Sequence, residues 1–167
     1  MSHIETERKF VISMPDIPTL ERQEGYFRRN IEQIYLASAP DITSRIRRSE
    51  SNGACTYFRT DKRRISAMSA IEDEREITAD EYSALRENIA HGSRPIVKTR
   101  HTFMFSGACF EIDVYPGWQT AAVLETELPD EGATVILPPF IKVIKEVTGD
   151  RRYSNATMSR RFPEVPK

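Results

Sequence analysis

Charged residues recur two positions apart in most extended segments of this chain, and this spacing constrains its fold more than any other feature. The pairs are Glu5 and Glu7, Arg45 and Arg47, Glu72 and Glu74, Lys98 and Arg100, Glu111 and Asp113, and Glu125 and Glu127. Since residues i and i+2 of a β-strand point to the same face, each pair lies on one side of its strand. The alternate positions are largely apolar, as in Phe110, Ile112 and Val114. The pattern therefore predicts a sheet with one charged and one apolar face.

Period-two alternation, with β-branched and aromatic residues, predicts eight strands. They cover residues 5–12, 31–37, 43–48, 56–62, 70–77, 96–105, 108–115 and 122–128. Helical signals are fewer: Thr78 is an expected N-cap with Glu81 three residues on, and a second helix is expected after the proline pair at 138–139. A short third helix is expected from Ser154 or Asn155. We expect one domain over residues 1–161 and a flexible C-terminal tail at 162–167.

The charged face has two conceivable positions. For one strand alone, a solvated outer face explains the alternation well. Several strands, however, carry an apolar opposite face that helices could cover. If the sheet closes with that face outward, the charges line its interior, and burying them requires water, ions and a highly charged ligand. We therefore predict a mainly β, α+β fold: an eight-stranded antiparallel closed tunnel barrel with accessory helices on its outside.

Composition excludes several classes of protein. Lys and Arg number 24 and Asp and Glu 25, a formal net charge of −1, which argues against binding of a nucleic-acid polymer. Cys55 and Cys109 have no CxxC spacing, and the histidines have no metal-ligand spacing, so reduced thiols are expected rather than a zinc site. The N-terminus is charged and no apolar run could cross a membrane. A cytoplasmic location is the expectation.

The residue types in the predicted tunnel indicate its chemistry. Carboxylate pairs suit hard divalent cations such as Mg²⁺ or Mn²⁺, which prefer oxygen ligands. Arginine and lysine pairs suit phosphate oxygens. Together they describe a site for a metal and a polyphosphate, and phosphoryl transfer depends mainly on positioning and charge stabilisation.

These motifs, in this order, resemble the CYTH superfamily of triphosphate tunnel metalloenzymes in its short bacterial form. The segment from Glu5 to Lys9 is similar to the N-terminal ExExK motif. The motifs that follow are IEQIYL at 31–36, RIR at 45–47, TDK at 60–62, EDE at 72–74, KTR at 98–100, FEIDV at 110–114, ETE at 125–127 and EVTGDRRYSN at 146–155. The resemblance covers nearly the whole chain and implies hydrolysis or cyclisation of triphosphates with a divalent metal.

The resemblance also implies roles for individual residues. The implied metal ligands are Glu5, Glu7 and Glu127 with Glu125 close by, followed by Glu72, Glu74, Glu111 and Asp113, some of them for a second, water-activating metal. The implied triphosphate-binding residues are Lys9, Arg45, Arg47, Lys62, Lys98 and Arg100, with Arg152 reaching the tunnel mouth. Catalysis is expected to rest on Glu5, Glu7, Lys9 and Glu127. Ala70 departs from the family, in which an arginine often precedes the ExE pair by two residues.

The leading expectation is a metal-dependent triphosphatase acting on inorganic tripolyphosphate or a related small triphosphate. The alternatives in the same fold are an adenylate cyclase, for which no adenine pocket is evident, and a thiamine triphosphatase, for which Trp118 could supply an aromatic platform. An alternative of another class is a non-catalytic polyphosphate or nucleotide-binding protein. Whether two chains form a homodimer stays open.

Overall fold

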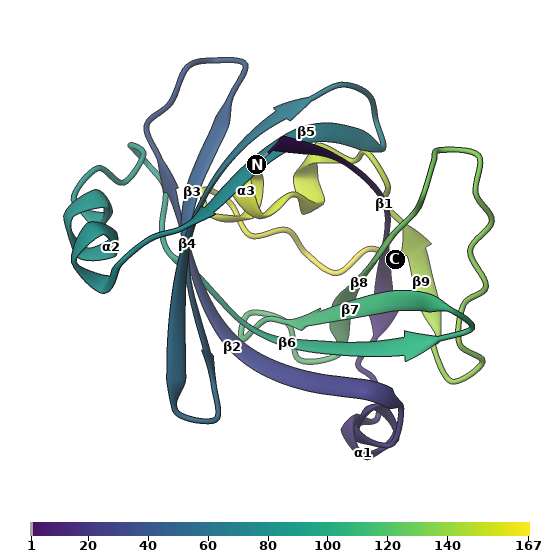
Figure 1. Ribbon diagram of the computed structural model, residues 1–167. Helices are drawn as coiled ribbons and strands as arrows, with labels where there is room; N and C mark the ends of the chain where they lie inside the picture. Colours follow the sequence, from purple (N-terminus) through teal and green to yellow (C-terminus); the bar gives the residue numbers. More distant parts are fainter. Residues whose placement is uncertain (1) are drawn as a thin grey trace.

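The computed structural model describes residues 2–167 and contains nine strands (Figure 1). They are β1 (Ser2–Ser13), β2 (Glu24–Leu36), β3 (Thr43–Ser51), β4 (Ala54–Arg64), β5 (Ser69–Glu76), β6 (Ile96–Phe105), β7 (Ala108–Val114), β8 (Ala121–Glu127) and β9 (Val143–Glu146). The helices are α1 (Ile17–Glu21), α2 (Ala79–Arg86), α3 (Asn155–Met158) and the 3-10 turn η1 (Arg151–Tyr153). No helix among residues 2–167 has the length and apolar character needed to cross a membrane.

Eight of the strands form a closed antiparallel barrel. The order is β5-β4-β3-β2-β6-β7-β8-β1, and pairing of β1 with β5 closes the ring. One edge of β1 is shared: residues 2–6 pair with β5 and residues 10–12 pair with β9. The eight predicted strands and the closed barrel are therefore confirmed, with several strands longer than predicted.

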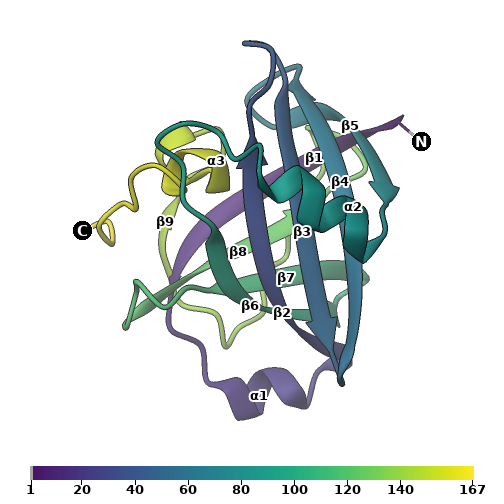
Figure 2. The same cartoon turned by 90° about the vertical axis from the view of Figure 1, so that its left-hand side faces the viewer.

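Apolar clusters cover the outside of the barrel, as the alternation predicts. One cluster, containing Ile34 and Ile46, lies between the sheet and α2, which crosses the outer face of β3 and β4 (Figure 2). The Thr78 capping box begins α2, because the Thr78 side chain accepts from the Glu81 N–H while the Glu81 carboxylate accepts from Thr78. A second cluster, around Phe103 and Phe110, is covered by α1 and by residues 135–141.

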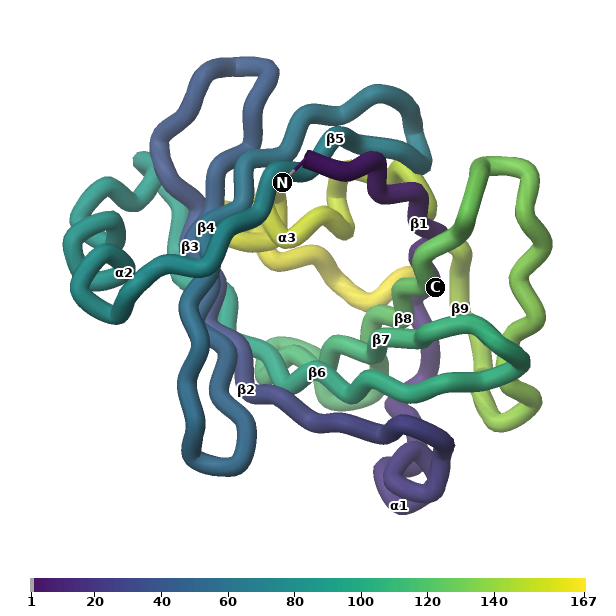
Figure 3. The backbone as a smooth tube through the Cα atoms, viewed as in Figure 1, coloured from purple at the N-terminus to yellow at the C-terminus, as the bar shows by residue number. Residues whose placement is uncertain are grey.

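A third apolar cluster closes part of the barrel from the inside. Val11 of β1, Tyr35 of β2 and Tyr115, which directly follows β7, pack with Trp118, Tyr153 and Met158. The C-terminal segment that carries the last two lies across one end of the ring (Figure 3). The expected flexible tail is anchored where it begins, because the Phe162 ring packs on Trp118 and the Trp118 indole N–H donates to the Pro163 carbonyl.

The prediction of a helix after residues 138–139 is wrong. Residues 143–146 form β9 instead, and Val143 and Lys145 pair with Ile12 and Val11 of β1. The backbone groups along this part of β1 would otherwise have no partner, since β5 ends its pairing at Thr6. Helix α1 was not predicted; it begins at the Asp16 cap, with Pro18 in its first turn.

The clusters outside the barrel should carry much of the stability. Ile46 is 0% exposed and packs between β3 and α2, so Ile46→Ala should lower the free energy of unfolding by about 3 kcal/mol. Ile136→Ala, at a residue that is 62% exposed, should change it by less than about 0.5 kcal/mol. Urea denaturation measures both. Equal effects of the two substitutions would contradict this assignment of the core.

Candidate active site

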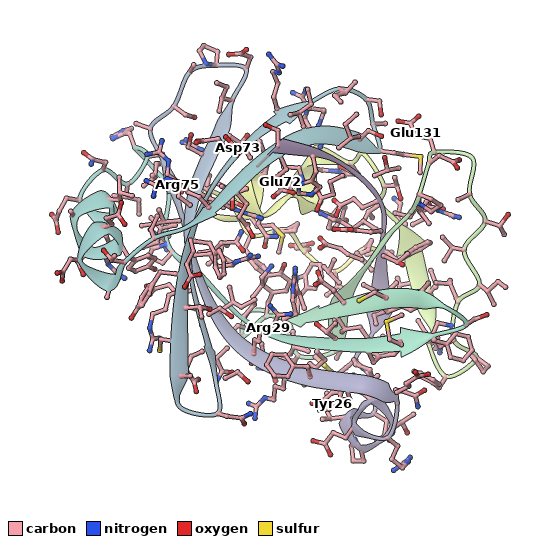
Figure 4. All side chains as sticks on the ribbon, in the orientation of Figure 1. Tyr26, Arg29, Glu72, Asp73, Arg75 and Glu131 are labelled. Atoms are coloured by element: carbon pink, nitrogen blue, oxygen red, sulfur yellow. The ribbon has the colours of Figure 1, made fainter. Side chains whose placement is uncertain are left out.

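The barrel encloses a cavity of about 720 Å³. Twelve of the residues singled out from the sequence line it: Glu5, Glu7, Lys9, Arg45, Arg47, Lys62, Glu72, Glu74, Arg100, Glu111, Glu125 and Glu127. The alternation explains this placement. Glu72 lies on the inner side of β5, while its neighbours Asp73 and Arg75 lie on the outer side (Figure 4). The charged face thus forms the inside of the barrel.

Basic residues of β3 and β4 pair with acids of β5 and β1. The guanidinium of Arg45 lies 3.0 Å from Glu72, and that of Arg47 lies 3.2 Å from Glu74, which also accepts from the Thr60 hydroxyl at 2.7 Å. Lys62 pairs with Glu5. Burial and the nearby Arg45 charge lower the pKa of Arg47 to about 10, because both favour its neutral form. The acids of β5 and β1 therefore fix the basic side chains of β3 and β4 in a row along the inside of the barrel.

A second network lies on β6, β7 and β8. Asp113 accepts from the Arg100 Nε and Nη2 atoms at 2.7 and 2.8 Å and from the Lys98 ammonium at 2.6 Å. Arg100 also bonds to Glu111 and lies 3.3 Å from Glu125. Lys98 and Asp113 are each 1% exposed and do not line the cavity, unlike the residues they support. Although burial opposes it, the two cations hold the pKa of Asp113 far below the usual carboxyl range.

Lys98 differs from the other cations in this network. Burial is the largest influence on it and lowers its pKa to about 8, aided by the Arg100 charge and opposed by Asp113. Its side chain is directed at Asp113 and lies against the Tyr115 ring, 5.9 Å from the ring centroid. It therefore orients Asp113 and Arg100 in this structure.

Carboxylates crowd together where β1 meets β8. Glu7 stands directly opposite Glu127 in the strand register, and Lys9 stands opposite Glu125. The Lys9 ammonium lies 2.9 Å from Glu125 and 3.7 Å from Glu7, so Glu7 has the weaker contact. Burial raises the pKa of Glu7, and the Glu125 charge adds to this. Burial likewise raises the pKa of Glu127, together with the charges of Glu5 and Glu111.

This acidic group fits a divalent cation by its chemistry. Like charges directly opposite each other destabilise a strand pair unless something neutralises them, and all the donors are carboxylate oxygens, the ligands that Mg²⁺ and Mn²⁺ prefer. Among residues 2–167, no three His, Cys, Asp or Glu side chains already converge closely enough to hold a metal ion. The carboxylates in position to hold such a cation are Glu7 and Glu127 with their neighbours Glu5 and Glu125.

Arg152 does not reach the cavity, contrary to the expectation. Its side chain is 67% exposed and pairs with Asp150, while the adjacent Arg151 lines the cavity. The turn η1 decides which of the two faces inward, and period-two reasoning does not apply to it. Arg64 was missed, although it stands two residues after Lys62 and so shares its face. Tyr35 was also missed as a lining residue, within the IEQIYL motif.

The buried network gives a prediction for stability. Asp113→Asn leaves Lys98 and Arg100 without their shared carboxylate and should lower the free energy of unfolding by about 3 kcal/mol. Asp150→Asn, whose partner Arg152 is exposed, should cost less than about 1 kcal/mol. Urea unfolding of metal-free protein compares the two. A cost at Asp113 no larger than at Asp150 would contradict the buried network.

The same carboxylate makes stability depend on pH. Because the pKa of Asp113 is depressed in the folded protein, the unfolded chain takes up the proton first as the pH falls through the usual carboxyl range. The free energy of unfolding should therefore decrease on acidification. In Asp113→Asn this part of the decrease should be missing, and the slope against pH should be shallower.

Comparisons with known proteins agree with this architecture. No family model matches the chain. It is 31% identical over 156 residues to the inorganic triphosphatase of Acetivibrio thermocellus, and the match covers 92% of each chain. The crystal structure of the inorganic triphosphatase NE1496 has 28% identity and a TM-score of 0.60, covering 96% of this chain and 97% of that one.

More distant structures share the fold alone. A putative adenylate cyclase from Bacillus halodurans has 18% identity and a TM-score of 0.53, covering 78% of this chain and 83% of that one. The PH1819 protein from Pyrococcus horikoshii has 24% identity and a TM-score of 0.58, covering 76% of this chain and 80% of that one. The close relative, the ordered motifs and the tunnel barrel together show that this chain belongs to the CYTH superfamily of triphosphate tunnel metalloenzymes.

Proposed function

We propose that this protein hydrolyses inorganic tripolyphosphate, or a related small triphosphate, in the barrel cavity with the help of Mg²⁺ or Mn²⁺. The observation that carries the proposal is the cavity lining, in which a row of cations on β3 and β4 lies within reach of the crowded carboxylates of β1 and β8. The inorganic triphosphatase relative supports the reaction class. A triphosphate offers oxygens to the cations and binds the same metal as the carboxylates.

The basic residues of the lining would bind and orient the triphosphate. Arg45, Arg47 and Arg100 offer planar guanidinium groups for bidentate contacts, and Lys9 and Lys62 offer point charges. Each is already held by a carboxylate, so its position is set before substrate arrives. Prearranged charge of this kind stabilises the charge that develops on transferring phosphoryl oxygens.

The acids divide into two groups in this proposal. Glu5, Glu7, Glu125 and Glu127 would hold the metal, because they cluster where β1 meets β8 and β5. Of these, Glu5 also pairs with Lys62 and Glu125 with Lys9. Glu72, Glu74 and Asp113 hold arginines, and Glu111 bonds to Arg100 while facing the cavity. A bound divalent cation supplies charge neutralisation and lowers the pKa of a water bound to it. Burial and the Glu125 charge raise the pKa of Glu7 in the metal-free protein, and a bound divalent cation would favour the charged form of this carboxylate.

The alternatives find less support in the lining. Among residues 2–167, the aromatic rings that line the cavity are those of Tyr35 and His3. Trp118 is 5% exposed and packs against Tyr115 and Phe162, so it forms no platform for thiamine or adenine. A protein that only binds anions does not need opposed carboxylates such as Glu7 and Glu127. Hydrolysis of an inorganic substrate is therefore favoured.

A phosphate-release assay tests the proposal. Tripolyphosphate, ATP and thiamine triphosphate are supplied with Mg²⁺ or Mn²⁺, and cyclic AMP is measured in parallel. We expect tripolyphosphate to be hydrolysed fastest, no cyclic AMP, and no turnover in EDTA. Binding of tripolyphosphate without release of phosphate under any metal condition would contradict hydrolysis and favour a binding protein.

Glu7 provides the sharpest mutational test. Glu7→Gln removes one of two opposed charges, so metal-dependent turnover should fall at least about 100-fold, since a carboxylate that binds metal or accepts a proton contributes this much. The free energy of unfolding should be unchanged or slightly higher, because a repulsion is relieved. Glu87→Gln at the exposed end of α2 is the control. Near-normal turnover of Glu7→Gln would contradict the role of this carboxylate.

A further inference from the structure

Three arginines of the cavity lining stand apart from the other cations. Arg63, Arg64 and Arg151, here called the arginine rim, line the cavity and are exposed. Among residues 2–167, none of the three forms an ion pair with a carboxylate. Every other lysine and arginine of the lining does so, as with Lys62 and Glu5. An anion can therefore bind at the rim without displacing an existing partner.

The strand register explains why Arg64 has no acidic partner among the residues that the structure describes. Thr60, Lys62 and Arg64 follow one another along the inner face of β4, and they stand opposite Glu74, Glu72 and Ala70 of β5. The first two rows contain an acid, while the third has only the methyl group of Ala70. Because alternate residues on one face are about 7 Å apart, Arg64 extends the row of cations by one step beyond Lys62.

The guanidinium group of Arg64 is fixed through only one of its nitrogen atoms, so the others can bind a ligand. Its Nη1 atom lies 3.4 Å from the Ser66 carbonyl oxygen and 3.2 Å from that of Ala67 and donates to both. Its Nε and Nη2 groups have no hydrogen-bond partner in the described part of the chain. These two groups form the edge of a guanidinium that binds an oxyanion through two parallel hydrogen bonds.

The turn that carries Arg64 is itself anchored. The Ser69 hydroxyl donates to the Glu131 carboxylate at 2.8 Å, and the Ser66 hydroxyl also donates to it. Glu131 lies beside this turn in Figure 4. Gly149 of the C-terminal segment packs against the same turn, so closely that a Cβ added to it would lie 3.0 Å from the Ala67 Cβ. The turn and the C-terminal segment with Arg151 are therefore in contact, which brings the rim residues together from two segments.

We propose that the arginine rim is a phosphate subsite at the cavity mouth, which binds the outward end of a linear inorganic polyphosphate of more than three phosphates. This inference rests on the proposed function for the class of anion, and it adds that chains longer than tripolyphosphate gain a contact. The rim residues are cationic, and among residues 2–167 only Tyr35 and His3 contribute aromatic rings to the cavity lining, which favours a continuing phosphate chain over a nucleoside or thiamine group.

Calorimetric titration in EDTA tests the subsite without any metal. Wild-type protein should bind tetrapolyphosphate more tightly than tripolyphosphate. Arg64→Ala should weaken tetrapolyphosphate binding about tenfold, the value of one exposed charge-assisted contact, and tripolyphosphate binding less than about twofold. Arg64→Lys should keep part of the affinity, since it retains the charge without the two-pronged edge. Arg28→Ala, an exposed arginine on β2 that does not line the cavity, is the matched control.

Kinetics with metal separate this inference from the proposed function. The KM for tetrapolyphosphate should rise in Arg64→Ala while kcat stays unchanged. Equal losses for both anions, or no loss for tetrapolyphosphate, would overturn the subsite even if wild-type protein hydrolyses tripolyphosphate. If wild-type protein releases no phosphate but shows the expected binding pattern, the subsite stands and hydrolysis is wrong.

Discussion

Pairing of opposite charges across neighbouring strands is the interaction on which the interior of this barrel depends. A hollow barrel lined with carboxylates or with guanidinium groups alone would repel itself and would lose the hydration of every charge. Here acids of β5 hold arginines of β3, and Asp113 holds Lys98 and Arg100. Because acids on neighbouring strands neutralise each row of basic side chains, a small protein can enclose a charged cavity. The same rows fix the directions of the side chains that line the cavity.

The exceptions to this pairing are the places to which we assign ligands. Glu7 and Glu127 face each other as acids, and Glu7 has only the 3.7 Å contact with Lys9. Within residues 2–167 the arginines of the rim have no carboxylate partner. Opposed carboxylates such as Glu7 and Glu127 raise the free energy of the folded state, so stability alone would not select them. The rim arginines are exposed and hydrated, which leaves them available to an anion. The two places therefore suggest one cation and one anion as the partners that complete the structure.

Much of the barrel could be predicted from period two alone, because a strand with one charged and one apolar face has only two orientations in a closed sheet. The motifs around Glu72 and Arg100 followed from the same rule. Prediction failed where the rule does not apply. Segment 143–146 has no alternation to distinguish it from a helix, and its strand conformation comes from the free edge of β1. In η1, tertiary packing rather than spacing directs Arg151 inward and Arg152 outward.

The shared edge of β1 also sets an order of events during synthesis. Residues 2–6 of β1 pair with β5 at residues 69–76, whereas residues 7–13 pair with β8 and β9 at residues 121–127 and 143–146. The second half of β1 therefore has no partner on either edge until these two late strands have been made. Contacts of such wide sequence separation slow folding, and an open strand can pair with other chains. The alternating charges of Glu5, Glu7 and Lys9 oppose such pairing, so the same charges that line the cavity also protect the strand before its partners are made.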